Sequence, residues 1–423
     1  MASYQITTYR GISHIGARNS FPCGPFFATN TTTGTITQPD RIYVVLLNQY
    51  NTNTATVTVG SLEVWMSTDT GVTWAQQDSI NSYPVGNLAT GTAGLNRASS
   101  WFDPTNAVIN IVYGADPLGT GPPVASTMGS FDCIHNTFGG TTTDGPTYND
   151  GHLTFLQIAK RSTGELAVMS PFTTPGIAFH FYMTEFTGGT WGTSVLFNTT
   201  NTGTGGFNFF QRPVGICPGS SGRIHCFFNA YEGTDAFGML KTVTFESGNT
   251  YGVEGSVGTN IDEGNCYPAR PLFYPSSGTL IIAEYNGSSS DVNVFTAAEA
   301  DVPTFSFTSA GIVESDPENF SVSAQINGTT TEVYEVVGPN YTTLQQGTNT
   351  GGGWSNGSIY VTLGGDFNFG NLDVGIVSGT SAVVLDEGTS SDFSDGHTII
   401  LFPSFTPPAA PIGLVLGPLN LTY

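Results

Sequence analysis

The stretch Ser67-Thr68-Asp69-Thr70-Gly71-Val72-Thr73-Trp74 predicts a folded hairpin loop from the spacing of its Ser, Asp, Gly and Trp residues. Short Ser and Asp side chains accept hydrogen bonds from backbone N–H groups in tight turns, and glycine readily adopts a positive φ. The tryptophan ring can then pack between neighbouring sheets. Strand-like runs flank the loop at 62–66 and 74–76, so we expect it to join two antiparallel strands.

This loop resembles the Asp-box of sialidase-like β-propellers, and the residues that carry the resemblance are Ser67, Asp69, Gly71 and Trp74. In that family the box joins the third and fourth strands of a blade and lies far from the active site. The resemblance therefore implies a structural role for these four residues. A degenerate second copy, Thr-Gly-Gly-Thr-Trp, lies at 187–191.

A hairpin pattern recurs along the chain: an apolar strand, a turn rich in Pro, Ser or Gly, and a second apolar strand. The turns of the clearest copies begin near residues 104, 161, 218 and 275, a steady step of 57 residues. Weaker copies turn at Pro39-Asp40, Asn327-Gly328 and Ser378-Gly379, which makes seven candidate units. A second series of aromatic residues follows the hairpins and indicates a second hairpin in each unit: Trp74, Trp191, Tyr251, Phe305 and Trp354.

Repeats of this length with four strands each are typical of β-propellers, whose ring removes most exposed sheet edges. We therefore predict an all-β fold, a six- or seven-bladed β-propeller of four-stranded antiparallel blades. The 54 glycines and the 12% aromatic content agree with many short strands joined by tight turns. A string of β-sandwiches is the alternative, but it would not readily produce a regular 57-residue step.

The repeat pattern divides the chain into three parts. We assign residues 36–404 to the propeller and residues 1–35 to an N-terminal segment that forms a module edge or an anchor. Residues 405–423 form a Pro-rich tail with the apolar run Ile412-Gly413-Leu414-Val415-Leu416. The tail can close the ring or clasp a neighbour, and we favour a neighbour because the repeats account for the blades without it.

Composition excludes several classes of protein. The formal net charge is −22, from 32 acidic and 10 basic residues, which disfavours binding to nucleic acid and to anionic membranes. The sequence shows no signal peptide and no apolar stretch of membrane-spanning length. The five cysteines form no C-x-x-C pair, so we expect buried thiols and neither a disulfide framework nor a bound metal. No phosphate-binding loop appears, and we expect no cofactor.

Three arginines are candidate ligand-binding residues. The repeat register predicts that Arg97, Arg212 and Arg270 begin the innermost strands of their blades, near the central axis. The run that starts at Arg270 resembles the sialidase arginine motif with its following hairpin. In that family three arginines grip the substrate carboxylate, because guanidinium groups bind its oxygens in bidentate fashion. The alternative is that these arginines hydrogen-bond to groups of neighbouring blades.

The resemblance also implies catalytic residues. A sialidase needs a tyrosine nucleophile activated by a glutamate, and an aspartate as acid and base. The candidates here are Tyr231, Glu232, Asp262 and Glu263, but none of them lies in an evident family context.

Three functions remain open. We favour a non-enzymatic virion or surface propeller that binds a glycan or host receptor, because the low charge and the richness in Thr, Gly and Asn resemble bacteriophage tail or virion proteins. Such a protein assembles in the host cytoplasm without a signal peptide, contacts other virion proteins and forms homo-oligomers. The alternatives are a sialidase-like glycoside hydrolase acting on acidic sugars and a purely structural assembly protein.

Overall fold

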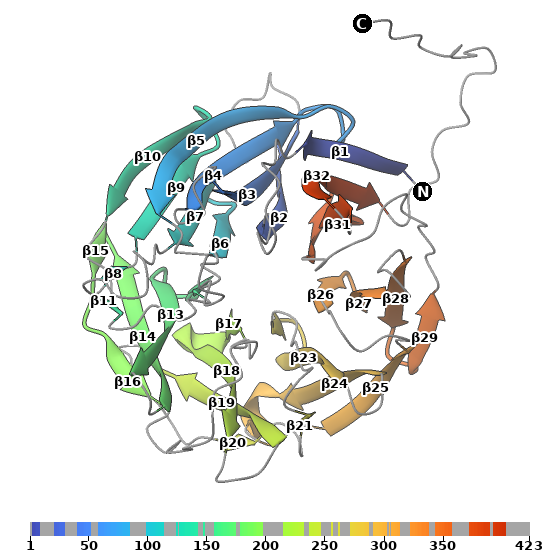
Figure 1. Ribbon diagram of the computed structural model, residues 1–423. Helices are drawn as coiled ribbons and strands as arrows, with labels where there is room; N and C mark the ends of the chain where they lie inside the picture. The colour runs from blue at the N-terminus through green and yellow to red at the C-terminus, as the bar shows by residue number, and fades with distance from the viewer. Residues whose placement is uncertain are drawn as a thin grey trace, which may run out of the picture.

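The computed structural model describes the following residues: 2–8, 21–29, 40–51, 58–84, 99–113, 124–125, 127–142, 147–148, 156–174, 178–197, 215–231, 237–246, 255–256, 261–262, 271–286, 291–302, 304, 306–313, 322–337, 343–357, 372–389 and 392–402. In these residues, seven antiparallel sheets of four or five strands stand around a central axis (Figure 1). This confirms the predicted all-β propeller of four-stranded blades. We number the blades I to VII in chain order.

The strands of each blade follow one another from the axis to the rim. Blade I contains β2 (Phe21–Ala28), β3 (Arg41–Asn51), β4 (Thr58–Ser67) and β5 (Ala75–Pro84). Blade II contains β6 (Ser99–Asp103), β7 (Val108–Tyr113), β9 (Thr127–Asp132) and β10 (Thr137–Thr142). Blade III contains β12 (Gln157–Lys160), β13 (Leu166–Thr174), β14 (Ala178–Thr187), β15 (Thr190–Trp191) and β16 (Val195–Phe197). A small separate sheet pairs β8 (Val124–Ala125) with β11 (Thr147–Tyr148).

The remaining blades repeat this order. Blade IV contains β17 (Ile216–Pro218), β18 (Ile224–Tyr231), β19 (Phe237–Phe245), β20 (Gly255–Ser256) and β21 (Ile261–Asp262). Blade V contains β22 (Leu272–Tyr274), β23 (Thr279–Asn286), β24 (Asp291–Ala298) and β25 (Ser306–Val313). Blade VI contains β26 (Val322–Asn327), β27 (Thr330–Val337), β28 (Thr343–Asn349) and β29 (Trp354–Gly357). Two short 3₁₀ turns, η2 (Ser220–Gly222) and η3 (Glu299–Asp301), lie in blades IV and V.

Blade VII closes the ring with strands from both ends of the chain. It contains β30 (Leu372–Val377), β31 (Thr380–Thr389), β32 (Asp392–Phe402) and, at its outer edge, β1 (Ala2–Thr8). β1 runs antiparallel to β32, with Ala2 opposite Phe402 and Thr8 opposite His397. The sequence pattern assigned residues 1–35 to an N-terminal segment, a module edge or an anchor; of its strands, β1 is the outer edge of blade VII and β2 is the innermost strand of blade I. The C-terminal part of the chain supplies three strands of blade VII, β30, β31 and β32. The N-terminal strand β1 pairs with the outer edge of β32 and is the fourth strand. The tail 405–423 lies outside the described residues.

The first hairpin of each blade turns where the repeat predicted. In blades II, III, IV and V the first two strands are joined at 104–107, 161–165, 219–223 and 275–278. In blades VI and VII the turns contain Gly328 and Gly379, both with positive φ. All seven hairpin positions therefore belong to separate blades, as the sequence pattern indicated.

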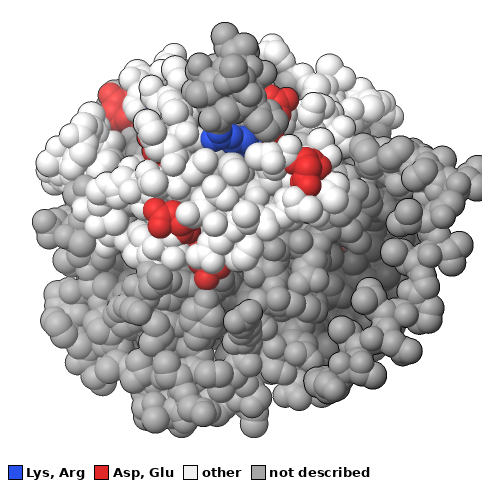
Figure 2. All heavy atoms as spheres, turned by 90° about the horizontal axis from the view of Figure 1, so that it is seen from above, with Lys and Arg blue, Asp and Glu red and all other residues white. Residues whose placement is uncertain are grey.

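Few charged residues mark the described surface on the side that Figure 2 shows. Figure 2 shows acidic side chains that lie apart from one another on this side of the ring, among mostly uncharged residues, with basic atoms in a small area. Among the residues that the structure describes, no helix is long and apolar enough to cross a membrane.

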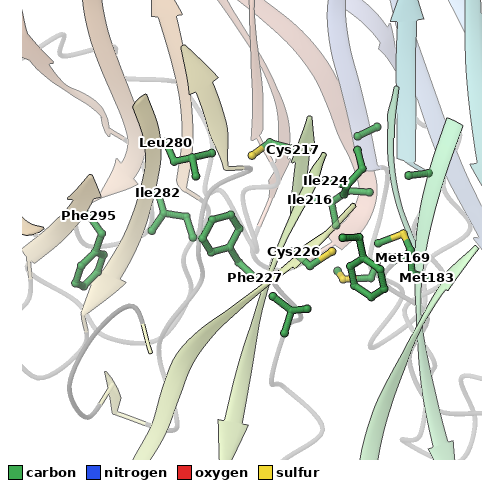
Figure 3. Close-up of a cluster of buried hydrophobic side chains, with 14 residues drawn as sticks. Met169, Met183, Ile216, Cys217, Ile224, Cys226, Phe227, Leu280, Ile282 and Phe295 are labelled. Carbon is green, nitrogen blue, oxygen red and sulfur yellow. The ribbon is translucent and has the colours of Figure 1, made fainter. Parts of the chain in front are cut away.

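Alternating side chains bury both faces of the inner strands. In β3, Ile42, Val44 and Leu46 pack against blade VII, whereas Tyr43 and Val45 pack against blade II. Blade IV is sandwiched in the same way between Met169 and Met183 of blade III and residues of blade V that include Leu280 and Ile282 (Figure 3). The core therefore lies between successive blades, and each blade needs both neighbours.

The loop from Ser67 to Trp74 joins β4 to β5, the third and fourth strands of blade I. The Ser67 hydroxyl donates to Asp69 Oδ1 at 2.8 Å and accepts from the Gly71 N–H at 2.9 Å. Asp69 also accepts from the Thr73 N–H at 2.8 Å and from the Thr73 hydroxyl at 2.6 Å. Burial alone would raise the pKa of the Asp69 carboxyl, but these hydrogen bonds outweigh burial and lower it.

The same loop packs into the contact between blades I and VII. The Trp74 indole donates to the Gly71 carbonyl at 2.7 Å, and its ring packs on the apolar cluster that contains Val384 and Ile400. Gly71 has a φ of 92°, and a Cβ at this position would lie 2.9 Å from the Phe402 ring. The loop therefore fits tightly against the strand that closes the ring.

Gly71→Ala tests this fit, and Gly379→Ala is its matched control. Both glycines have positive φ, but a Cβ at Gly379 would meet nothing within 4 Å. We expect about 1 kcal/mol of destabilisation in the control from backbone strain and about 2–3 kcal/mol at Gly71, where a collision adds to the strain. Urea unfolding measures both losses. Equal losses would show that the contact with Phe402 is not tight.

Candidate functional site

The antiparallel order of strands gives the ring two different ends. The first hairpin turns and the loops between third and fourth strands lie at one end, which we call the turn face. The innermost strands of the blades begin at the opposite end, which we call the start face. In the same order, the second strand of each blade ends, and its third strand begins, at the start face.

The three predicted ligand-binding arginines lie outside the described residues. In sequence, Arg97 comes two residues before β6, which begins at Ser99, and Arg270 comes two residues before β22, which begins at Leu272. Arg212 comes four residues before β17, which begins at Ile216. β6, β17 and β22 are the innermost strands of blades II, IV and V.

Two of the four catalytic candidates lie in described strands of blade IV. Tyr231 ends β18 opposite Gly238, and Asp262 ends β21 opposite Phe237. Both residues therefore belong to the start-face end of the blade, but they lie on opposite sides of β19. Two strand spacings separate their backbones by about 10 Å. Glu232 and Glu263 lie outside the described residues.

At the turn face, Arg161 connects blade III to blade IV. Its side chain is completely buried and forms an ion pair with Glu185 of its own blade, with 3.0 Å between Nε and Oε1. Nη1 donates to the carbonyl of Gly222 and, at 3.3 Å, to that of Phe245. The Gly222 N–H in turn donates to the Ser162 hydroxyl at 2.7 Å. The turn of blade III is therefore fixed to blade IV through backbone groups.

Arg41 makes the equivalent connection from blade I to blade II. Its Nη1 donates to the Cys133 carbonyl at 2.7 Å, and the Tyr43 hydroxyl donates to the same carbonyl at 3.0 Å. The Tyr43 hydroxyl is also 2.8 Å from Asn136 Oδ1. Burial is the main reason that the pKa of Tyr43 lies far above its ordinary value. A neutral phenol therefore serves here as a hydrogen-bond donor.

An ion pair near the axis joins blades II and III. Lys160 Nζ is 2.5 Å from Asp103 Oδ2, and both residues end innermost strands. Asp103 also accepts from the Thr105 N–H at 3.0 Å and from Asn106 Nδ2 at 2.8 Å. Burial would raise the pKa of Asp103, but the hydrogen bonds from Lys160, Asn106 and Thr105 outweigh burial and lower it. The Asp103 carboxylate therefore both stabilises its own turn and binds Lys160 of blade III.

Ser220, His225 and Glu299 connect blades IV and V, but they do not form a catalytic triad. Glu299 lies between the other two: it accepts from His225 Nε2 at 2.9 Å and from the Ser220 hydroxyl. In a triad the histidine lies between the serine and the acid, so that it can remove the hydroxyl proton. The carboxylate here instead joins groups of the neighbouring blade.

The described cysteines are packing residues. Cys23, Cys133, Cys217 and Cys226 are buried thiols and form no disulfide with one another. Burial raises the pKa of the Cys133 thiol to about 12 and also raises those of Cys217 and Cys226, so the reactive thiolate is scarce at neutral pH. Within the described ranges, no group of three or more His, Cys, Asp or Glu residues could hold a metal ion. Cys266 lies outside these ranges.

Sequence reasoning missed Arg41 and Arg161 as residues that connect blades. The contacts between blades that we considered for Arg97, Arg212 and Arg270 are made at the turn face by these two residues. Their position at the first hairpin turn was visible in the repeat. Their hydrogen-bond partners in the next blade could not be predicted, because these backbone carbonyls are tens of residues away in sequence and no local pattern points to them.

Comparison with known proteins identifies the fold alone. No protein-family model and no curated protein matches the sequence. An ulvan lyase described as bound to -[GlcA(1-4)Rha3S]- is similar in structure, with a TM-score of 0.51 and 10% identity over 91% of this chain and 94% of its own. The polysaccharide lyase Uly1 has a TM-score of 0.50 and 12% identity over 85% and 88% of the two chains. The Trypanosoma rangeli sialidase in complex with sialic acid has a TM-score of 0.46 and 12% identity over 73% and 54%.

Arg161→Leu tests the contact between blades III and IV. Removal of the buried guanidinium leaves two carbonyls and a carboxylate without their donor, so we expect a loss of about 3 kcal/mol in unfolding free energy. Arg223→Leu is the control, because its ion pair with Glu246 has side chains that are 37% and 48% exposed. Such pairs contribute at most about 1 kcal/mol. Similar losses in urea unfolding of both variants would contradict a special role for Arg161.

Proposed function

We propose that this chain is a non-enzymatic propeller that binds an acidic glycan on its start face, with Arg97, Arg212 and Arg270 as the ligand-binding residues. The observation that carries the proposal is their place in the chain, directly before the innermost strands of three blades. Two residues span at most about 7 Å and four at most about 14 Å. Covalent geometry therefore limits how far each arginine can lie from the beginning of its strand.

Charge supports an arginine-based site for a carboxylate. The chain has a formal net charge of −22, so an acidic glycan would be repelled without local positive groups. The guanidinium group is planar and offers several donors, which suits bidentate binding of carboxylate oxygens. Arginines before three inner strands would concentrate such groups near the axis. The polysaccharide lyases of similar fold support the view that this ring can present a saccharide site.

The sialidase-like glycosidase is the competing function. A tyrosine nucleophile, its activating glutamate and an acid–base aspartate must surround one sugar ring. Tyr231 and Asp262 share one end of blade IV, which favours the alternative, but β19 runs between their backbones. We therefore propose binding without turnover.

The place of the protein in an assembly is part of the proposal. The low share of charged residues, 10%, and the richness in Thr, Gly and Asn support a virion or surface protein, such as a phage tail component. Such a protein would contact other virion proteins and a host glycan. The apolar run 412–416 supports assembly, because four aliphatic side chains gain about 1.5–3 kcal/mol each when they leave water. A purely structural protein would also assemble with other proteins, but it would not bind a glycan.

Binding of acidic saccharides tests the proposed site. In titration calorimetry with sialyllactose and with glucuronic acid oligosaccharides, we expect binding of at least one, and none of neutral lactose. Arg97→Ala, Arg212→Ala and Arg270→Ala should each weaken binding about 10- to 100-fold, since each removes charge-assisted hydrogen bonds.

The control for this experiment is Arg223→Ala, on the turn face, which should bind as the wild type does. Unchanged binding in all three variants would refute the site. A fluorogenic sialoside should not be hydrolysed. Hydrolysis that Arg212→Ala or Arg270→Ala abolishes would establish the glycosidase instead.

Deletion of residues 405–423 tests the role of the tail. We expect a folded, soluble ring, because β1 already closes blade VII. We also expect loss of self-association, measured by light scattering, with an unchanged melting temperature. A large fall in melting temperature would show that the tail stabilises its own ring.

A further inference from the structure

A buried carboxylate of blade V accepts all its described hydrogen bonds from blade IV. Glu299, in η3, accepts from His225 Nε2 and from the Ser220 N–H, both at 2.9 Å through Oε1, and from the Ser220 hydroxyl through Oε2. The side chains of His225 and Glu299 are only 1% and 8% exposed. The contact therefore links a strand and a turn of one blade to a 3₁₀ turn of the next, in a site with little water.

The backbone of blade IV covers this pair. A Cβ on Gly219 would lie 2.3 Å from Glu299 Oε1 and 2.5 Å from His225 Nε2. Only a glycine allows the turn to lie so close to both groups. This close approach leaves little of the His225 and Glu299 side chains exposed.

Both nitrogens of the His225 ring are engaged. Because the Glu299 carboxylate only accepts, Nε2 carries the proton in the neutral ring. Nδ1 then accepts from the Thr244 hydroxyl, which is 2.9 Å away on β19. A second proton on the ring would turn Nδ1 into a donor, so the Thr244 hydroxyl would have to reverse its direction. It would also place a positive charge in a buried site.

We propose that His225 and Glu299 form a proton-sensitive latch between blades IV and V, which holds at neutral pH and weakens in mild acid. The groups around His225 have opposing effects. Burial lowers its pKa most, and Arg223 acts in the same direction, whereas Glu299 and Glu246 raise it. The buried Cys217 thiol on β17 also lies near Glu299. The net result is a pKa below the ordinary value of 6.5.

The sign of the pH effect follows from linkage. As the pH falls below 6.5, histidine in the unfolded chain takes up a proton that buried His225 resists, so the folded state loses stability. Burial would raise the pKa of Glu299, but the hydrogen bonds from Ser220 and His225 lower it below 4.5. Protonation of Glu299 at still lower pH therefore weakens the latch again. Protonation of the histidine and protonation of Glu299 therefore both lower the stability of the folded state as the pH falls.

His225→Gln tests the latch, because glutamine keeps a neutral donor and acceptor and cannot titrate. We expect the wild type to lose about 1–2 °C more in melting temperature than His225→Gln between pH 7.5 and 5.5. His135→Gln is the control: its ring is 73% exposed and pairs with Asp132, and this variant should follow the wild type. Titration of the many other acidic groups is common to all three proteins and cancels in the comparison.

A second measurement does not depend on a variant that folds. Histidine-selective labelling gives six ring signals to follow in an NMR titration of the wild type. The latch requires one ring with an apparent pKa clearly below 6.5, the signal that His225→Gln removes when that variant folds. If every ring titrates at or above 6.5, or if His225→Gln loses as much stability in acid as the wild type, the proposal is wrong.

Discussion

Every blade of this protein depends on its neighbours, because its sheet is apolar on both faces. Leu280 and Ile282 of β23 pack against blade IV, whereas Ile281 and Ala283 pack against blade VI. A sheet of this kind cannot bury its faces alone, so the fold is stable only when the circle is complete. The pairing of β1 with β32 completes it and joins residues from the two ends of the chain. Ring closure is therefore the constraint on which the other contacts depend.

Polar contacts at the turn face fix how the blades fit together. Apolar packing tolerates small sliding movements, but a hydrogen bond between a buried guanidinium and a carbonyl has a defined direction and length. Arg41 supplies this bond between blades I and II, and Arg161 supplies it between blades III and IV. Between blades V and IV, the Glu299 carboxylate accepts a hydrogen bond from His225 instead. Only 10% of the residues are charged. Several of these few occupy the contacts between blades, where leaving a polar partner unpaired is costly.

The sequence predicted what short-range patterns encode. Hairpin turns near 104, 161, 218 and 275 were visible because both strands of each hairpin are adjacent in sequence. The role of β1 was not visible, since its partner β32 lies at the other end of the chain. For the same reason the connection from His225 to Glu299 could not be predicted from residues 74 positions apart. The proposed arginine site rests on chain position, because Arg97, Arg212 and Arg270 lie outside the described residues.

Under the proposed function, the two faces of the ring would separate stability from ligand binding. The loop at Ser67–Trp74 and the turns that contain Arg161 and Ser220 lie on the turn face, where they hold neighbouring blades together. The residues assigned to the ligand precede the innermost strands, at the opposite end of those strands. Sites more than about 10 Å apart without shared partners contribute nearly independently to stability. If the start face binds a glycan as we propose, substitutions in its loops could therefore change the ligand while the contacts between blades remain.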